Sequence, residues 1–253
     1  MFVDSDDALL PDALAVLFEG LSGEDLAVGG YTVYIEGTPG REVLPRRSCS
    51  YRGEDMNKFY TDNIRKNCEM LDAPWAKLFR RKAIGKLRFN ESLSYAEDKL
   101  FVFGFLSECK SIYTCPHTVY HYYLRPGSLG SDRSSDRHVD QLNIFLPFYA
   151  DLLGKICKRV PESRKAAGLY HRDLVGRYVC RALNILATRR TKWCMPIFVD
   201  FLYSLMKDDP ALTVFSIRPG QVVNVMLFKI GNPSFTAGIY RATAWLVSLF
   251  KRK

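Results

Sequence analysis

The stretch Met1–Pro11, "MFVDSDDALLP", places three aspartates directly after a short apolar run. The apolar run predicts the end of a β-strand, and residues two apart on an extended backbone project from the same side. We therefore expect the carboxylates of Asp4 and Asp6 to converge on one cation, since Mg²⁺ and Mn²⁺ prefer oxygen ligands of this kind. A second interpretation stays open, in which Ser5 or an aspartate caps a helix that begins near Pro11.

The apolar pattern continues as alternating strands and helices, which is typical of an α/β fold. Valine, tyrosine and isoleucine predict a strand over 26–37, and the polar, basic segment 37–53 predicts a loop. The other elements expected in this half are helices over 11–20 and 54–70, a short strand over 77–79 followed by a brief helix, a buried helix over 95–111 whose first turn holds Glu97 and Asp98, and a strand over 111–125 that Pro116 interrupts.

The second half of the chain has a different pattern. From residue 139 onward the sequence predicts several helices separated by prolines and no strand. The Gly- and Ser-rich segment 125–138 marks the change. We therefore expect an α/β domain over 1–130 and an all-helical region over 139–253.

Charge is divided unevenly along the chain. The first 38 residues contain eight acidic and no basic side chains, so with a total net charge of +9 the remainder holds +17. The acidic start suits metal binding, and the basic remainder suits anionic partners such as phosphates or lipid head groups. Nucleic acid is not expected as a partner, because no nucleic-acid-binding motif accompanies the basic segments.

The seven cysteines include no C-x-x-C pair, which argues against a disulfide framework and against a zinc ribbon. The acidic start lacks the features of a signal peptide, and no apolar run reaches the ~20 residues that a membrane-spanning helix requires. We expect reduced thiols in a cytoplasmic protein.

Four segments in this order carry a family resemblance: "FVDSDD" (2–7), "PWAKLFRRKAI" (74–84), "LRFNESLSYAEDKLF" (87–101) and "YHYYLRPGSL" (120–129). Together they resemble bacterial family 2 glycosyltransferases of the GT-A fold. The resemblance covers about residues 1–130 and implies a partial, Rossmann-like nucleotide-sugar transferase core, followed by the all-helical region. The segments correspond to the second half of such a core, so we also expect the chain to lack the N-terminal nucleotide-binding half.

The resemblance implies that Asp4 and Asp6 bind a divalent metal, Mn²⁺ or Mg²⁺, which bridges the diphosphate of a nucleotide-sugar donor. It assigns Asp98 as the general base that takes the proton from an acceptor hydroxyl, with inversion at the anomeric carbon. A helix start favours an ionised carboxylate, so we expect Asp98 to be ionised at neutral pH. The resemblance further implies donor-diphosphate contacts by Arg125, Ser128 and His121, and acceptor-binding or base-supporting roles for Glu97, Trp75 and Lys77.

Simpler structural roles remain open for several of these side chains. Glu97 and Asp98 would complement the dipole of the helix that they begin. Trp75 and His121 would be packed side chains, and Lys77 would be a solvated surface charge.

The segment 233–253 ends the chain with apolar residues at helical spacing and the basic run 251–253. One interpretation is an amphipathic helix in peripheral contact with the inner face of a membrane, close to a lipid-linked acceptor. The other is a terminal helix docked on the core, with its basic residues at the favourable end of the helix dipole.

The leading hypothesis is an inverting, metal-dependent glycosyltransferase of bacterial surface polysaccharide synthesis, with a glycan or lipid-linked acceptor. A haloacid-dehalogenase-like phosphatase is one alternative, because "FVDSDD" also resembles the strand and D-x-D of that family. The other alternative is a non-catalytic relic or peripheral membrane module, in which the acidic residues are structural.

Overall fold

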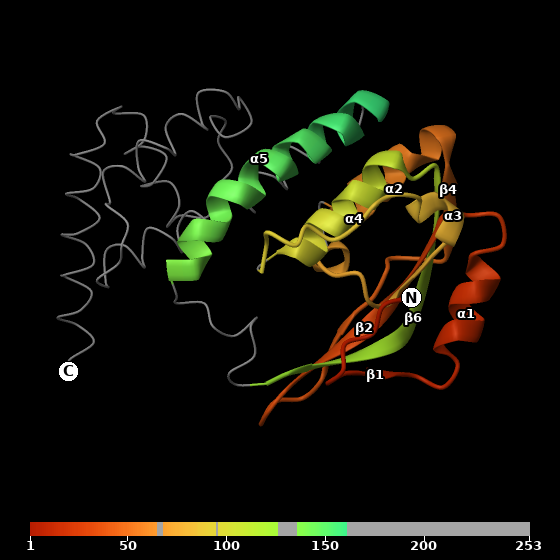
Figure 1. Cartoon of the computed structure of the whole chain (residues 1–253). Coiled ribbons are helices and arrows are strands. Elements are labelled where there is room, and N and C mark those ends of the chain that lie inside the picture. The colour runs from red at the N-terminus through yellow and green to blue at the C-terminus, as the bar shows by residue number, and fades with distance from the viewer. Residues whose placement is uncertain (65–67, 95, 126–135, 161–253) are drawn as a thin grey trace, which may run out of the picture. The chain divides into compact units, whose positions relative to one another are not determined.

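The computed structural model describes residues 1–64, 68–94, 96–125 and 136–160 (Figure 1). The chain divides into two compact units, one formed by 1–132 with 144–170 and the other by 133–143 with 171–253. The described elements lie almost entirely in the first unit. The predicted helical region beyond residue 160 lies outside the described residues, as do residues 126–135 of the predicted boundary segment 125–138, and both remain predictions.

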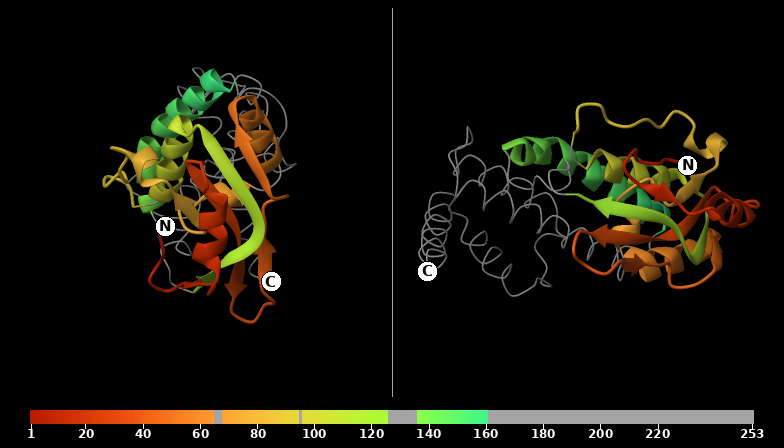
Figure 2. Two further views of the ribbon diagram at one scale, coloured as in Figure 1. Left: turned by 90° about the vertical axis from the view of Figure 1, so that its right-hand side faces the viewer. Right: turned by 90° about the horizontal axis from the view of Figure 1, so that it is seen from below.

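A mixed β-sheet forms the centre of the first unit. Its strands within the described residues are β1 (Ala8–Leu9), β2 (Leu26–Ile35), β3 (Arg41–Val43), β4 (Cys49–Arg52), β5 (Lys77–Phe79) and β6 (Ser111–Leu124). The two long strands, β2 and β6, pair in parallel and lie side by side in both views of Figure 2. The four short strands pair antiparallel to them: β1 and β4 with β6, and β3 and β5 with β2.

The middle of the β2–β6 pair is irregular. Regular pairing of Leu26–Val28 breaks at Gly29 and Gly30 and resumes at Tyr31. The break lies opposite the region of Pro116, which cannot donate a ladder hydrogen bond. Both glycines are closely packed, because an added Cβ would lie 2.6 Å from Val119 at position 29, and 2.3 Å from Leu44 Cδ2 and 3.1 Å from the carbonyl oxygen of Val43 at position 30. The interruption that Pro116 was expected to cause is therefore a register shift within β6, which remains one continuous strand.

The helices pack on this sheet through the apolar side chains that the sequence pattern predicts to be buried. They are α1 (Ala13–Gly20), α2 (Met56–Ile64), α3 (Arg81–Ile84), α4 (Glu97–Glu108) and α5 (Asp136–Arg159), with 3-10 turns at Gly53–Asp55 and Cys68–Leu71. The α1 helix buries Ala13 and Leu17 against the sheet. All residues of α4 from 99 to 107 are buried, as the sequence predicts. Within the described part of the chain, no helix is both long and apolar enough to cross a membrane.

Two expectations from the sequence are wrong, and a third is only partly met. The first three residues form no strand. The predicted loop 37–53 contains β3 and β4, whose few residues become strands only by pairing with the edges of β2 and β6. Such tertiary pairing overrides a local polar sequence. In addition, the helix predicted over 54–70 is shorter, because α2 ends at Ile64 and a separate 3-10 turn begins at Cys68.

Candidate active site

The aspartates at the start of the chain lie in a turn. The backbone N–H of Asp7 donates to the carbonyl oxygen of Asp4 at 3.2 Å, which closes a four-residue β-turn. Asp4 and Asp6 therefore do not share one side of an extended strand, as the sequence suggested. We call residues 4–7 the acidic turn.

Strand β6 holds the acidic turn in place. The hydroxyl of Tyr120 donates to Asp7 Oδ2 at 2.7 Å and accepts from the backbone N–H of Asp4 at 3.1 Å. The backbone N–H of Tyr123 donates to Asp7 Oδ1 at 2.9 Å. Asp7 thus stabilises the turn, and none of these bonds uses the carboxylate of Asp4 or Asp6.

Phe2 brings the acidic turn close to helix α4. Its ring packs edge-on against Phe79 of β5, Phe89 and Phe101 of α4, with centroid distances of 5.7, 5.4 and 5.2 Å. Phe101 lies one helical turn after Asp98, so the packing of Phe2 places Asp4 near the start of α4. The apolar N-terminus therefore acts as an anchor on α4 and β5.

The first turn of α4 begins from a strained backbone position. Ala96 has φ +63°, and no side chain caps the helix start. A non-glycine residue in this left-handed region costs roughly 1 kcal/mol or more, and such strain is common at functional sites. Lys99, in the same turn, is buried and forms an ion pair of 2.7 Å with Asp72. This ion pair ties the helix start to the segment before β5.

The two acidic groups influence each other. Burial raises the pKa of Asp98 to about 7, and the negative charges of Glu97 and Asp4 raise it further than burial would by itself. Burial also raises the pKa of Asp4, as do the charges of Asp7, Asp6 and Glu97. This mutual influence agrees with the packing of Phe2 against Phe101, which brings the acidic turn toward the start of α4. The helix start does not keep Asp98 fully ionised at neutral pH, contrary to the expectation from sequence, because burial outweighs the helix dipole.

Lys77 is a second buried cation of this region, besides Lys99. Its side chain is 1% exposed, and its Nζ donates to the carbonyl oxygens of Ala73 at 2.7 Å and Trp75 at 3.3 Å. Burial lowers the pKa of Lys77 to about 7, although the charges of Asp72 and Asp98 act in the opposite direction. Lys77 is therefore not a solvated surface charge, and its charge in turn lowers the pKa of Asp98.

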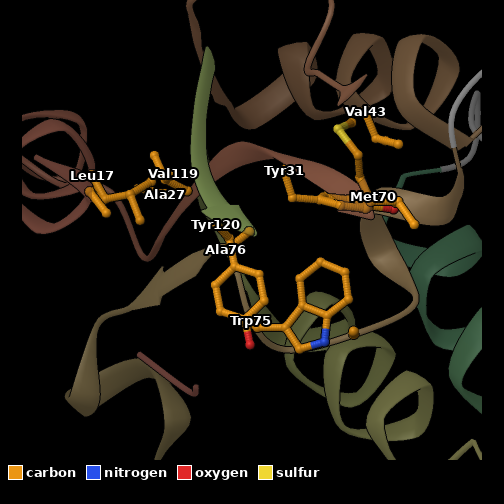
Figure 3. Close-up of a cluster of buried hydrophobic side chains, with 12 residues drawn as sticks. Leu17, Ala27, Tyr31, Val43, Met70, Trp75, Ala76, Val119 and Tyr120 are labelled. Carbon is orange, nitrogen blue, oxygen red and sulfur yellow. The ribbon is translucent and has the colours of Figure 1, made fainter. Parts of the chain in front are cut away.

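Trp75 is packed among tyrosines rather than presented to solvent. Its ring is 7% exposed, stacks on Tyr120 at 4.9 Å and on Tyr122 at 5.2 Å, and meets Tyr31 edge-on at 4.6 Å. Figure 3 shows Trp75 and Tyr120 next to each other in the buried cluster. This arrangement favours the packing role for Trp75.

Of the three residues expected to contact the donor diphosphate, the structure describes Arg125 and His121. Arg125 lies beside the acidic turn, where its Nη2 donates to the carbonyl oxygen of Asp6 at 3.3 Å. His121 alternates with Tyr120 and Tyr122 along β6, so it projects from the other face of the sheet, where it contacts Tyr34 edge-on at 5.1 Å. The position of Ser128 lies outside the described residues.

A divalent metal can bind at this site only if carboxylate oxygens are not already used in hydrogen bonds or ion pairs. Within the described residues, the carboxylates of Asp4, Asp6, Glu97 and Asp98 make no hydrogen bond or ion pair. The same residues contain no group of three or more His, Cys, Asp or Glu side chains that meets the geometry of a metal site. A pair of carboxylates fits Mg²⁺ or Mn²⁺ if a substrate supplies further oxygens, since Mg²⁺ is usually bound by one or two carboxylates together with phosphates.

Tyr120 and Phe2 are the site residues that sequence reasoning missed. The tyrosine-rich segment of β6 was visible in the sequence, but its alternation does not reveal which hydroxyl reaches the acidic turn. Phe2 was interpreted as part of a strand because a run of three apolar residues carries no information about its partners.

The fold is similar to that of S. aureus TarS. The crystal structure of TarS residues 1–349 in complex with UDP-GlcNAc has a TM-score of 0.58 and 16% identity, over 96% of this chain and 65% of that chain. The complex of the same protein with UDP has a TM-score of 0.57 and 17% identity, over 96% and 66%. This chain therefore spans slightly less than two thirds of the TarS structures. At these identities the similarity establishes a GT-A-like fold. No protein-family model and no curated protein sequence matches the chain.

Proposed function

We propose that the chain carries the acid–base part of a glycosyltransferase, which moves a sugar from a nucleotide-diphosphate donor to a hydroxyl of a glycan or lipid-linked acceptor. The observation that carries the proposal is the proximity of Asp98 to Asp4, two acids that are more than 90 positions apart in the sequence. The GT-A-like fold supports it, because the similar TarS structures contain UDP-GlcNAc and UDP. The acceptor class comes from the sequence resemblance.

Asp98 is the proposed general base. A catalytic base works best when its pKa lies near the operating pH, because it is then both ionised and basic. Burial and the charges of Glu97 and Asp4 bring the pKa of Asp98 to about 7, which meets this condition. Glu97 thus supports the base through its charge, and Lys77 limits the rise of the pKa.

Asp4 and Asp6 are the proposed metal ligands, with the donor diphosphate supplying further oxygens. A bound divalent metal would neutralise the charge that develops on the leaving diphosphate. Arg125 lies beside the acidic turn and is exposed, so its guanidinium is available to the same phosphates. Asp7 is left to its structural role, because both of its carboxylate oxygens accept hydrogen bonds from β6.

The proposed reaction is a single displacement. The acceptor oxygen forms a bond to the anomeric carbon while the bond from that carbon to the diphosphate oxygen breaks. The proton of the acceptor hydroxyl moves to Asp98, and the nucleoside diphosphate leaves with the electron pair. Attack from the face opposite the leaving group inverts the anomeric configuration.

Calorimetric titration with UDP-GlcNAc and Mn²⁺ tests the assignment of the metal ligands. Because the chain spans less than two thirds of the TarS structures, the titration uses the 253-residue chain and any longer gene product that contains it. Donor affinity should fall at least about 10-fold on Asp4→Asn or Asp6→Asn, since each change removes a charged metal ligand. Asp12→Asn is the matched control, because Asp12 is exposed and pairs with His117 at 3.0 Å, outside the acidic turn.

The outcomes separate the three functions suggested by the sequence. Metal-dependent binding that survives both changes in the acidic turn would refute the metal assignment. Release of free phosphate from small phosphoesters, without sugar transfer, would favour the phosphatase. A protein that binds neither donor nor metal but sediments with anionic vesicles would favour the membrane module. The expected membrane contact of 233–253 lies outside the described residues and is tested by the same vesicles.

A further inference from the structure

Tyr120 is placed to control the geometry of the acidic turn. It lies on β6, its side chain is 0% exposed, and its hydroxyl reaches both ends of the turn. The hydroxyl accepts from the backbone N–H of Asp4 at 3.1 Å and donates to Asp7 Oδ2 at 2.7 Å. This one hydroxyl therefore accepts a hydrogen bond from Asp4 and donates one to Asp7, the two residues that the turn hydrogen bond also joins.

The other hydrogen bonds of the turn do not duplicate this connection. The bond from Asp7 N–H to Asp4 carbonyl oxygen closes the turn on itself without fixing it to the sheet. The backbone of Tyr123 holds only Asp7. Among the hydrogen bonds of the described residues, the bond to Tyr120 is thus the one that fixes the backbone of Asp4 to the sheet.

The ring of Tyr120 is held in place by the ring of Trp75. It stacks on Trp75 with the two ring planes nearly parallel, at an interplanar angle of 3° and a centroid distance of 4.9 Å. Trp75 is itself fixed by the edge contact with Tyr31 and by its carbonyl oxygen, which accepts from Lys77. The ring therefore has little freedom, and its hydroxyl is a rigid support for the turn.

We propose that Tyr120 is a positioning residue, whose hydroxyl holds Asp4 in the orientation that faces the start of α4. Trp75 then acts through the ring of Tyr120 and need not touch a sugar. The consequence for metal affinity rests on the proposed function, whereas the consequence for the acidic turn itself does not.

Hydrogen exchange of the N-terminal segment tests the structural part. Tyr120→Phe keeps the ring and removes the hydroxyl. Exchange in a peptide covering residues 1–10 should become about 10-fold faster, since a hydrogen bond to a carboxylate and one to a backbone N–H are lost. Tyr60→Phe is the matched control, because it removes a buried hydroxyl that donates to Leu106 carbonyl oxygen, far from the turn in sequence. Exchange in helix α1 serves as an internal reference.

The result that would overturn the proposal is equal exchange of residues 1–10 in Tyr120→Phe and the unaltered protein. Equal acceleration in Tyr120→Phe and Tyr60→Phe would overturn it as well, because the effect would then be a general loss of stability. Trp75→Leu, which removes the stacked ring but no hydrogen bond to the turn, should also accelerate exchange in residues 1–10 relative to α1.

Calorimetry with Mg²⁺ tests the functional part on the same proteins. Tyr120→Phe should weaken Mg²⁺ binding about 10-fold, and Tyr60→Phe should leave the affinity unchanged. Faster exchange together with unchanged Mg²⁺ affinity would refute the positioning role toward the metal. If the unaltered protein binds no Mg²⁺, the proposed metal ligands fail, and the exchange experiment still decides whether Tyr120 holds the turn.

Discussion

The fold favours the neutral form of Asp98. Ionisation of Asp98 therefore lowers the free energy of unfolding, and this loss can be measured. Its folded pKa of about 7 lies above the value of about 3.9 for an unfolded aspartate. Between these two values the folded state binds the extra proton, so stability falls as pH rises from about 4 to about 7. Catalytic groups often carry such a penalty, because the environment that tunes them disfavours their charge.

Replacement of Asp98 by asparagine should therefore stabilise the protein. We expect the free energy of unfolding, measured by urea titration without metal, to rise by about 2 kcal/mol at pH 8. Near pH 4 the gain should be small, because Asp98 is then protonated in the folded state and about half protonated in the unfolded state, so the two states bind nearly the same number of protons. Asp12→Asn is the control, and equal gains at both pH values would contradict the raised pKa.

The same pKa predicts the pH dependence of transfer. The base is active when ionised, so the transfer rate should rise with pH as Asp98 ionises and then level off, and a cation bound at Asp4 would move this rise below the metal-free pKa of about 7. Asp98→Asn should abolish transfer at every pH while leaving donor affinity nearly intact. A rate that is already maximal at pH 5 would mean that another group is the base.

Ala96 carries strain at the start of α4. With φ +63°, the residue is in a conformation that glycine adopts without steric cost. Ala96→Gly should leave the free energy of unfolding unchanged or raise it by up to about 1 kcal/mol. Ala83→Gly, in the regular helix α3, should lower it by about 1 kcal/mol. A comparable loss in both variants would show that Ala96 is not strained.

At the level of elements, α4 is fixed at its C-terminal end by the last residue of α5. The guanidinium of Arg159 donates to the carbonyl oxygens of Ser107 at 2.7 Å, Leu106 at 3.0 Å and Cys109. These carbonyls lie at the negative end of the helix dipole, where a cation is favourable. A helix that is fixed at its far end presents Asp98 at a defined place.

Arg159→Met should lower the free energy of unfolding by about 1–2 kcal/mol, because Arg159, although exposed, donates several charge-assisted hydrogen bonds to the last carbonyl oxygens of α4. Lys158→Met is the control, since Lys158 is exposed in the same helical turn. Thermal or urea unfolding of both variants provides the comparison, and equal losses would contradict the account of α4.

The glycine pair in β2 gives a second test at this scale. A methyl group at position 30 would lie 2.3 Å from Leu44 Cδ2 and 3.1 Å from the carbonyl oxygen of Val43. Gly30→Ala should therefore lower the free energy of unfolding by about 2 kcal/mol. Gly154→Ala in α5 should instead raise it by about 0.5–1 kcal/mol, because nothing lies within 4 Å of the added methyl group.

At the level of the whole molecule, the sequence predicted elements whose signal is local. The α1 helix, strands β2 and β5, and the buried helix α4 follow from apolar spacing and flanking turn residues. Strands β3 and β4 could not be predicted, because they exist through pairing with β2 and β6. The order of the four family segments predicted a GT-A-like fold, which the similarity to TarS confirms.

The candidate site was predictable only in outline. The family resemblance implied roles for Asp4 and Asp98 in one reaction, whereas the turn conformation, the support by Tyr120 and the burial of Lys77 depend on contacts between distant parts of the chain. The face of the sheet on which His121 lies could not be predicted from residue types, because strand register sets that face and a shift of one residue would reverse it.

The central claim is that the acidic turn and the start of α4 form one site. NMR titration of ¹³C-labelled aspartate carboxyls, without metal, tests it by comparing the unaltered protein with Asp4→Asn. We predict that Asp98 titrates near pH 7 and that its pKa falls when Asp4 loses its charge. An Asp98 that titrates near pH 4 in both proteins would contradict the claim.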